Sequence, residues 1–364
     1  MLHCGIVGLP LSGKSTIFNV ITRAGAEVKP YAGGKTDPNK AVVEVPDKRF
    51  DFLVEVHKPR KVTPAQVEFV DLAGLSRGAG KGEGLGNSFL SFVADADALI
   101  QVIRCFANKT VEHPEGSIDP IRDWDIIENE LIFGDLAVIE NRLGKLKSKK
   151  KLTSEEEIEK KLLDACFECL LEERPLRSME LKPAEWRLLR GFSFVTSKPE
   201  ILLLNLDDSQ SDETKIPKWD ELKKRADEQG VKLCTLYGSL EMDIAELDEE
   251  EAAAFTEGLD ITEPGREKLI EEAYRVLGLI SFFTCGPDEV RAWTLHEGDN
   301  AVDAAGAIHS DLARGFIRAQ VVAFGDYKKH GSSFDECRKA GCLRLEGKEY
   351  LVRDGDIIEI RFNV

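Results

Sequence analysis

Short apolar runs alternate with stretches of helical periodicity along the first hundred residues, which is the order expected of a parallel α/β sheet. The candidate strands in this part are continuous, mostly aliphatic runs at His3–Val7, Ala41–Val45, Gln66–Asp71 and Ala98–Ile103. Two more strands of the same kind appear only after a long interruption, at Ile201–Leu206 and Lys232–Leu236. The pattern therefore predicts one parallel sheet that is interrupted by a long inserted segment.

The inserted segment is predicted to form two long helices. Asp119 can cap the first helix, and Pro120 is tolerated at its first position. Apolar side chains then recur at spacings of four and three, as in a coiled-coil seam, at Ile132, Leu136, Ile139, Leu143 and Leu146. A second helix opens at Ser154, with Glu157 completing a capping box. We expect residues 119–195 to form an antiparallel hairpin, an arm of roughly 30–42 Å at 1.5 Å per residue.

The C-terminal segment predicts a small mixed α+β domain. Asp299 can cap a helix that ends at Gly315. Strand-like pieces with alternating or continuous apolar residues lie around it, at Val290–Leu295, Phe316–Phe324, Leu343–Leu345, Tyr350–Val352 and Ile358–Val364. The predicted domains are therefore a sheet domain of residues 1–118 and 196–278, the arm of residues 119–195, and a C-terminal domain of residues 279–364.

Charge is distributed unevenly over the 364 residues. The formal net charge of −17 excludes a surface that binds nucleic acid all over, because phosphates repel acidic surfaces. Residues 208–272 carry most of it, with 20 acidic and eight basic side chains. The predicted tip of the arm is basic instead, with Lys145, Lys147, Lys149, Lys150 and Lys151. A solvated tip and a contact with RNA phosphates both remain open.

Composition places the chain among cytoplasmic proteins with reduced thiols. Apolar runs fall far short of the roughly 18 residues that a membrane span needs, and the first residues show no signal peptide. Disulfides are not expected among the eight cysteines. Cys166 and Cys169 have metal-like spacing, but their place in a helix seam favours core packing. Cys337 and Cys342 lie five positions apart near a glycine; inert thiols are expected, and a redox-responsive pair is the alternative.

The strongest chemical signal is a phosphate-binding loop. Gly8–Ser15 matches GxxxxGK[ST], follows an apolar strand and precedes a helical stretch, a context that a chance glycine-rich turn would lack. Glycines let backbone amides point at phosphate oxygens, Lys14 reaches the β- and γ-phosphates, and Ser15 binds Mg²⁺. The predicted nucleotide-binding residues here are Gly8, Leu9, Pro10, Leu11, Ser12, Gly13, Lys14, Ser15 and Thr16.

A second motif, Asp71–Gly74, follows the third strand. It places the Asp71 carboxylate near the magnesium and the Gly74 amide near the γ-phosphate, which makes Gly74 a candidate catalytic group together with Lys14. Glycine then recurs at every second position from 78 to 86, so the segment can rearrange when the γ-phosphate leaves. Leu75 stands where Ras-type switches carry the Gln that orients water, so that side chain cannot serve catalysis.

The base-binding residues are expected after the fifth strand. Asn205-Leu206-Asp207-Asp208 stands where guanine-specific proteins carry NKxD, but the lysine is missing. Asp208 can still accept hydrogen bonds from guanine, so this tetrad leaves ATP and GTP both open. Gly238 and Ser239, after the next strand, are expected to back the base.

Taken together, these motifs resemble the YchF family of Obg-like ATPases over nearly the whole chain. The residues that carry the resemblance are GLPLSGKST, VEVPDKRFD, DLAGLSRGAGKGEGLGNSFL, DPIRD, FIRAQ and VRDGDIIEIRFNV. The resemblance implies a P-loop domain of the Ras-like GTPase class, an inserted helical hairpin and a C-terminal ubiquitin-like α+β domain called TGS. It also implies a monomeric, Mg²⁺-dependent nucleotide switch that prefers ATP and binds the ribosome or its RNA through the arm and the TGS domain, to regulate translation or a stress response.

Specific residues also take roles from the resemblance. A loop histidine in the family is proposed to act on the attacking water, and His113 stands at the matching position. Leu75 matches the hydrophobic replacement of the catalytic Gln. The chain departs from the family in its first switch, where Thr36 is displaced by one position, so either Thr36 or no side chain caps the magnesium. A second departure is Asp208, where the family usually has Glu.

Two other functions fit part of the pattern. A P-loop small-molecule kinase explains Gly8–Ser15, but it explains neither Asp71–Gly74 nor the tetrad at Asn205. A nucleotide-gated binding module with negligible turnover is permitted by the missing Gln and by the displaced switch threonine.

Overall fold

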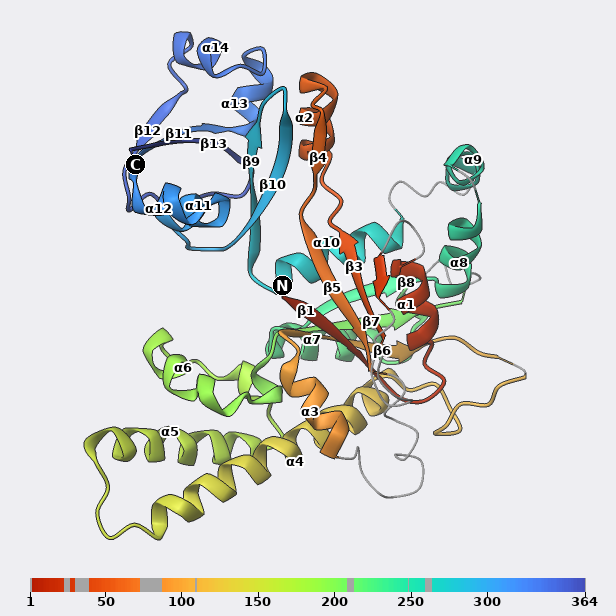
Figure 1. Ribbon diagram of the computed structural model, residues 1–364. Helices are drawn as coiled ribbons and strands as arrows, with labels where there is room; N and C mark the ends of the chain where they lie inside the picture. The colour runs from red at the N-terminus through yellow and green to blue at the C-terminus, as the bar shows by residue number, and fades with distance from the viewer. Residues whose placement is uncertain are drawn as a thin grey trace. The chain divides into compact units, whose positions relative to one another are not determined.

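The computed structural model describes residues 2–22, 27–29, 39–72, 87–108, 110–207, 213–247, 249–258 and 264–363. The chain divides into two compact units. The first comprises Met1–Val43 and Glu68–Leu269, and the second comprises Glu44–Val67 and Ile270–Val364. Both are mixed α/β structures, as Figure 1 shows.

A seven-stranded sheet forms the centre of the first unit, in the order β2-β3-β5-β1-β6-β7-β8. The strands of the sheet are β1 (His3–Val7), β2 (Glu27–Lys29), β3 (Asn39–Glu44), β5 (Gln66–Asp71), β6 (Ala98–Arg104), β7 (Glu200–Asn205) and β8 (Lys232–Leu236). From β5 to β8 all neighbours are parallel, so the predicted parallel sheet is confirmed. Because β1 lies between β5 and β6, the segments after these three strands start at one edge of the sheet.

Helices α1 to α10, apart from α2, accompany this sheet in the chain, and α10 continues from the first unit into the second. Their bounds are α1 (Lys14–Thr22), α3 (Asn87–Asp95), α4 (Pro120–Lys147), α5 (Ser154–Leu171), α6 (Pro183–Leu189), α7 (Trp219–Gln229), α8 (Gly238–Glu246), α9 (Glu249–Gly258) and α10 (Gly265–Val276). Val7, Leu99 and Leu202 share one face of the sheet. α3, the first half of α4 and α7 cover that face with apolar side chains.

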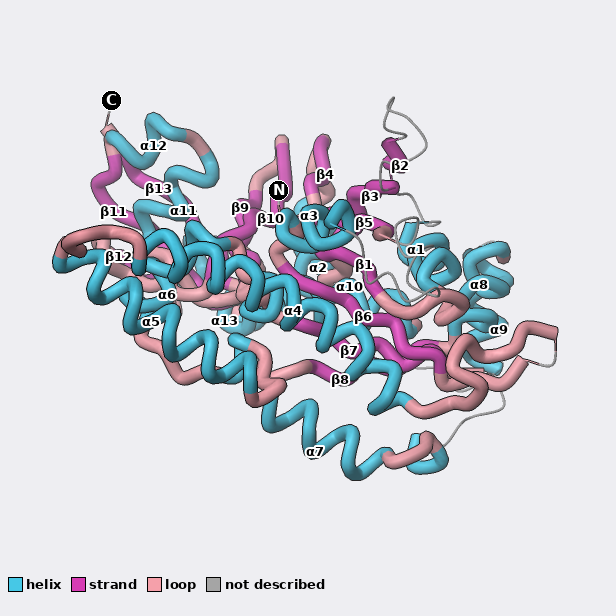
Figure 2. Tube along the Cα trace, turned by 90° about the horizontal axis from the view of Figure 1, so that it is seen from below, coloured by secondary structure: helices cyan, strands magenta, loops and turns pink. Residues whose placement is uncertain are grey.

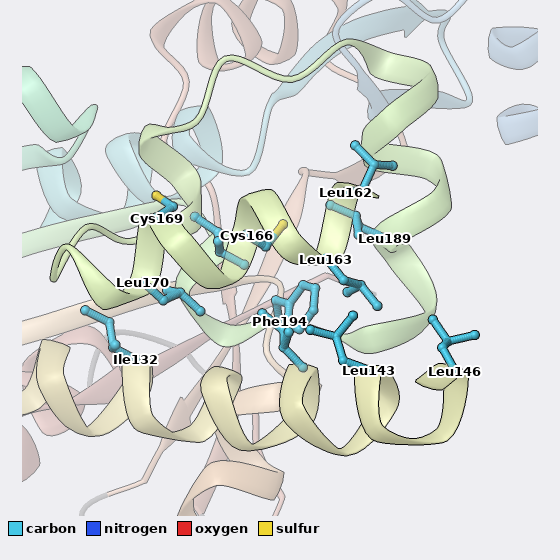
Figure 3. Packing of buried hydrophobic residues seen from close by; sticks show 12 residues of the cluster. Ile132, Leu143, Leu146, Leu162, Leu163, Cys166, Cys169, Leu170, Leu189 and Phe194 are labelled. Atoms are coloured by element: carbon cyan, nitrogen blue, oxygen red, sulfur yellow. The ribbon is translucent and has the colours of Figure 1, made fainter. Parts of the chain in front are cut away.

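The second half of α4 leaves the sheet and pairs with α5 as an arm. At 1.5 Å per residue the 28 residues of α4 span about 42 Å, and Figure 2 shows α5 running alongside. Figure 3 shows the apolar seam between the two helices, which includes Ile132, Leu143, Leu146, Leu162, Leu163, Cys166, Cys169 and Leu170. The predicted hairpin is therefore confirmed, and Cys166 and Cys169 are buried core residues.

Caps explain where the arm helices begin. Asp119 caps α4 by accepting from the Arg122 amide, and Pro120 is its first residue, as predicted. α5 does begin at Ser154, but its capping box is formed one residue earlier than predicted, by Thr153 and Glu156. Thr153 lies just before the helix, whereas Ser154 is its first residue. The Thr153 hydroxyl can therefore accept a hydrogen bond from the amide of the third helical residue, Glu156.

Buried polar groups attach the arm to the sheet domain. Asp135 of α4 accepts from the amides of Val195 and Thr196 at 2.9 and 2.8 Å. Burial raises the pKa of Asp135 to about 6, although these hydrogen bonds oppose the shift. Arg177 forms buried ion pairs with Glu128 of α4 and Glu200 of β7. Since breaking a buried pair costs about 3–5 kcal/mol, these contacts hold the base of the arm.

A six-stranded sheet, in the order β12-β11-β13-β9-β10-β4, forms the second unit. Its strands are β4 (Lys61–Thr63), β9 (Leu279–Cys285), β10 (Glu289–His296), β11 (Phe316–Ala323), β12 (Arg344–Glu346) and β13 (Asp356–Phe362). Its helices are α2 (Lys48–His57), α11 (Ala301–Ile308), α12 (Ser310–Arg314), α13 (Phe324–Lys329) and α14 (Phe334–Lys339). The C-terminal part is thus the predicted α+β structure.

Three details of the second unit differ from the prediction. The predicted sheet domain included residues 44–67 and 270–278, but β4 pairs in parallel with β10, and both segments belong to the second unit. The helix after β10 is capped by Asn300, in a capping box with Asp303, and not by Asp299. The longer predicted helix is also split, because His309 caps a separate α12.

No helix in the described ranges combines the length and the apolar character that crossing a bilayer requires.

Candidate nucleotide-binding site

The phosphate loop, defined here as residues 8–13, connects β1 to α1 and runs close to β6. Gly8 has φ +145°, and a Cβ there would lie 2.5 Å from the carbonyl oxygen of Val102. Only glycine fits this close backbone approach. The Ser12 amide donates back to the Leu9 carbonyl at 3.3 Å, which curls the loop toward the start of α1. The predicted strand, loop and helix are therefore all in place.

Lys14 is folded into the loop that precedes it. Its Nζ donates to the carbonyls of Gly8 and Leu9 at 2.9 and 2.7 Å, and only 6% of the residue is exposed. Burial lowers the pKa of Lys14 to about 8, while the nearby Asp71 carboxylate raises it. An anionic phosphate would add negative charge beside this buried ammonium group and so favour its charged form.

Oxygen donors for a magnesium ion lie close to this lysine in the fold. Ser15 is exposed in the first turn of α1. Asp71, 7% exposed, ends β5 and is in register with Ile6 of β1. A hydroxyl and a carboxylate fit Mg²⁺, which usually takes few protein ligands and completes its shell with phosphate and water. Among the described residues no cluster of three His, Cys, Asp or Glu residues forms a larger metal site.

Asn205 joins the base side of the site to the phosphate loop. Its Nδ2 donates to the Ser12 carbonyl at 3.1 Å, and its Oδ1 accepts from the Gly238 amide at 3.2 Å. Leu206 is buried, and Ser239 is exposed at the start of α8. The structure therefore brings Asn205, the predicted backing loop and the phosphate loop together through the side-chain amide of Asn205.

Several predicted site residues lie outside the part of the chain that the structure describes. They are Thr36, Gly74, Leu75 and Asp208.

The histidine loop, defined here as residues 105–119, joins β6 to α4 at the same sheet edge as the phosphate loop (Figure 1). His113 lies in it with a side chain that is only 6% exposed. Its Nε2 is 3.0 Å from Oδ2 of Asp123, and its Nδ1 accepts from the Glu115 amide at 3.1 Å. Both ring nitrogens thus have partners within the loop and the first turn of α4.

Three residues that sequence analysis missed shape this loop. Arg104 stacks on Phe106 and donates to the Val111 carbonyl at 2.8 Å. Arg122 donates to Oδ1 of Asp123 through Nε and Nη2, at 3.0 and 2.7 Å. Burial raises the pKa of the Asp123 carboxyl, opposed by Arg122 and His113. The DPIRD motif contains Arg122 and Asp123, so this motif was the feature of the sequence that could have identified them.

Comparisons with known proteins agree with this architecture. Residues 3–156 match the family model described as a 50S ribosome-binding GTPase, and residues 279–363 match the YchF-GTPase_C model, described as a protein of unknown function. The chain is 42% identical to the ribosome-binding ATPase YchF of Bacillus subtilis, covering 100% of both chains. It is 40% identical to the protein of that name from Haemophilus ducreyi, covering 99% of both. The solved structure of the Schizosaccharomyces pombe YchF GTPase superposes with a TM-score of 0.87 at 36% identity, covering 99% of this chain and 97% of that one.

Proposed function

Because the chain belongs to the YchF family, we propose that it hydrolyses ATP on the ribosome and acts there as a nucleotide switch. The observation that supports it most is the buried Lys14 ammonium group, which the loop's own carbonyls hold where a triphosphate would bind. GTP remains the alternative nucleotide.

We assign Mg²⁺ binding to Ser15 and Asp71, with Thr36 as the candidate switch residue. When bound, the metal neutralises phosphate charge. The chain's own residues do the rest: amides of the phosphate loop hold the β-phosphate, Lys14 contacts the β- and γ-phosphates, and the Gly74 amide binds the γ-phosphate.

His113 is the candidate for acting on the attacking water, because Leu75 cannot. Its ring nitrogens both have protein partners in this conformation, so basal turnover should be slow. The histidine loop leads directly into α4, so a partner that binds the arm can move the histidine loop. His113→Ala should keep ATP and ribosome binding but lose most of the ribosome's acceleration, roughly 10²-fold or more. Equal stimulation of the parent and the variant would reject His113.

The basic arm tip is the proposed contact with ribosomal RNA. Five exposed lysines surround the turn between α4 and α5, namely Lys145, Lys147, Lys149, Lys150 and Lys151. Lys149 pairs with Glu156 at 2.5 Å. The other four have no ion pair with a described residue within 4.0 Å, so their charges are available to phosphates.

Charge-removal variants test this contact. Replacing Lys147, Lys150 and Lys151 by Ala should weaken co-sedimentation with ribosomes about tenfold or more and flatten its salt dependence. The matched control is Lys223→Ala with Lys224→Ala, which removes two exposed lysines from α7. An unchanged salt dependence in the tip variant would show that the ribosome contact lies elsewhere, with the C-terminal α+β domain as the remaining candidate.

Single-turnover hydrolysis of ATP, with and without purified ribosomes, tests the function as a whole. We expect slow release of phosphate from the protein alone and a marked acceleration by ribosomes. Tight binding without phosphate release in either condition would favour the gated binding module. Transfer of the γ-phosphate to a small molecule, with no effect of ribosomes, would favour the kinase.

A further inference from the structure

We propose that Asp123 is the positioning residue for His113. Because Asp123 faces Nε2, Nδ1 is the imidazole atom that accepts a hydrogen bond from the attacking water. The inference rests on the proposed function and names the machinery behind it. The phosphate site does not use the DPIRD motif, which runs from Asp119 to Asp123. The proposal assigns a role to the last residue of that motif.

The contact between the two side chains is buried. The His113 side chain is 6% exposed and that of Asp123 is 2% exposed, with Nε2 and Oδ2 3.0 Å apart. Oδ2 makes no hydrogen bond with a described residue that meets the usual geometry, and Nε2 of His113 is the nitrogen that lies 3.0 Å from it. Since an unsatisfied buried carboxylate oxygen is costly, a small adjustment of the ring that lets Nε2 donate to Oδ2 would be favourable.

No other histidine of the chain is placed in this way. All six lie in described segments, and His3 and His309 also have a carboxylate within 4.0 Å. Their side chains are 20% and 64% exposed, and the partner carboxylates are 36% and 48% exposed. Among the residues that the structure describes, a buried imidazole against a buried carboxylate occurs only at His113.

The contacts of the two ring nitrogens indicate which one carries the proton. Nδ1 accepts from the Glu115 amide, so it cannot itself be protonated in this conformation. The proton of the neutral ring is therefore on Nε2, where it faces the Asp123 carboxylate. Nδ1 carries the electron pair that can accept a hydrogen bond from water, and in this conformation the Glu115 amide donates to that pair.

Arg122 holds the carboxylate in place and ties it to the loop. Its guanidinium binds Oδ1 of Asp123, the Ser117 hydroxyl at 2.9 Å and the Ser117 carbonyl at 2.6 Å. Asp123 therefore presents Oδ1 to Arg122 and Oδ2 to His113. A shift of the first turn of α4 would move the carboxylate, the guanidinium and the imidazole together.

The chemical step needs only a nucleoside triphosphate and water. When the Glu115 amide releases Nδ1, that atom accepts a hydrogen bond from the attacking water. As the water oxygen bonds to the γ-phosphorus, the bond from phosphorus to the bridging oxygen breaks and the diphosphate leaves. The water proton passes to Nδ1, and the Asp123 carboxylate balances the charge of the imidazolium until the proton returns to solvent.

Three variants test the proposal by single-turnover ATP hydrolysis on ribosomes. Asp123→Asn should lower the stimulated rate about 10- to 100-fold and change the dissociation constant for ATP less than threefold. Asp125→Asn is the matched control in the same helix, since the Asp125 carboxylate pairs with Arg225 and not with a group of the histidine loop, and it should keep the parent rate. Asp123→Glu retains a carboxylate and should recover part of the rate.

Nitrogen-15 NMR of labelled histidine supplies a readout that a merely structural role would not move. The parent should show His113 protonated at Nε2 alone, and Asp123→Asn should show a mixture of tautomers. An Nδ1-protonated ring in the parent would overturn the proposal even if Asp123→Asn fails to fold. A parent-like stimulated rate in Asp123→Asn, with loss in His113→Ala, would overturn the role of Asp123 alone. A parent-like rate in His113→Ala would overturn the proposed role of His113 first.

Discussion

The phosphate loop and the histidine loop follow adjacent parallel strands, yet they are held in different ways. The phosphate loop is packed closely against other backbone, with Gly8 against the Val102 carbonyl, and its carbonyls bind the buried side chains of Lys14 and Asn205. The histidine loop is held largely by side chains from its flanks, namely Arg104 at the end of β6 and Arg122 and Asp123 in α4.

This difference separates two tasks. A loop held by close backbone contacts has one conformation available and suits a fixed binding site for phosphate. A loop held by a few polar side chains can change conformation when its anchoring helix moves, without unfolding the sheet. We therefore infer that nucleotide binding belongs to the first loop and that control of turnover lies in the second.

Glycine substitutions should show the largest contrast between the loops. Gly8→Ala places a methyl group 2.5 Å from the Val102 carbonyl oxygen at φ +145°, so backbone strain and overlap should each cost about 1–3 kcal/mol. Gly116 has φ +74° but no atom within 4 Å of an added Cβ, so Gly116→Ala should cost about 1 kcal/mol. Denaturant unfolding measures both, and equal losses would contradict the contrast.

Lys14→Ala should weaken ATP binding without unfolding the protein. A hydrogen bond to a charged group contributes about 1.5–3 kcal/mol, so the dissociation constant should rise roughly 10- to 150-fold. Isothermal titration calorimetry measures it, and His113→Ala is the comparison variant from the other loop. Unchanged affinity in Lys14→Ala would reject the phosphate-loop assignment.

The pH dependence of ATP affinity should reflect the same lysine. Burial lowers the pKa of Lys14 to about 8, so the free protein loses this proton as the pH rises through 8. Phosphate binding favours the charged form, so affinity is fully present below pH 8 and falls above it, about tenfold by pH 9. Calorimetry in buffers of different ionisation enthalpy should detect proton uptake at pH 9, and its absence would contradict the predicted linkage.

The smallest effect concerns the base. Without the lysine that packs over guanine in NKxD proteins, ATP should bind at least as well as GTP. Competitive titration tests this, and a preference for GTP of tenfold or more, about 1.4 kcal/mol, would contradict it. Such a result would indicate that Asp208 binds guanine.

Local patterns predicted the phosphate loop and the arm because each is encoded over short distances. The match at Gly8–Ser15 lies within one strand, loop and helix, and the seam from Ile132 to Leu146 repeats within one helix. The α/β sheet domain and the α+β C-terminal domain followed from the same kind of local periodicity, whereas the Ras-like class and the TGS assignment came from the family resemblance.

Long-range partners escaped the same reasoning. β4 is three residues long and joins a sheet whose other strands lie more than 200 positions away, so no local signal assigns Lys61–Thr63 to the second unit. His113 was a candidate from its position in the chain, but its pairing with Asp123 depends on how the loop folds back onto α4. Asp123 could have been predicted only as a polar residue in the first turn of a helix.

Amide hydrogen exchange in the ATP-bound protein, with and without ribosomes, tests the separation of the two loops most directly. Ribosome binding should accelerate exchange in the histidine loop, including the Glu115 amide that covers Nδ1 of His113, while the phosphate loop, including the Ser12 amide, stays as protected as before. Unchanged or slower exchange in the histidine loop, or equal acceleration in both loops, would contradict the account.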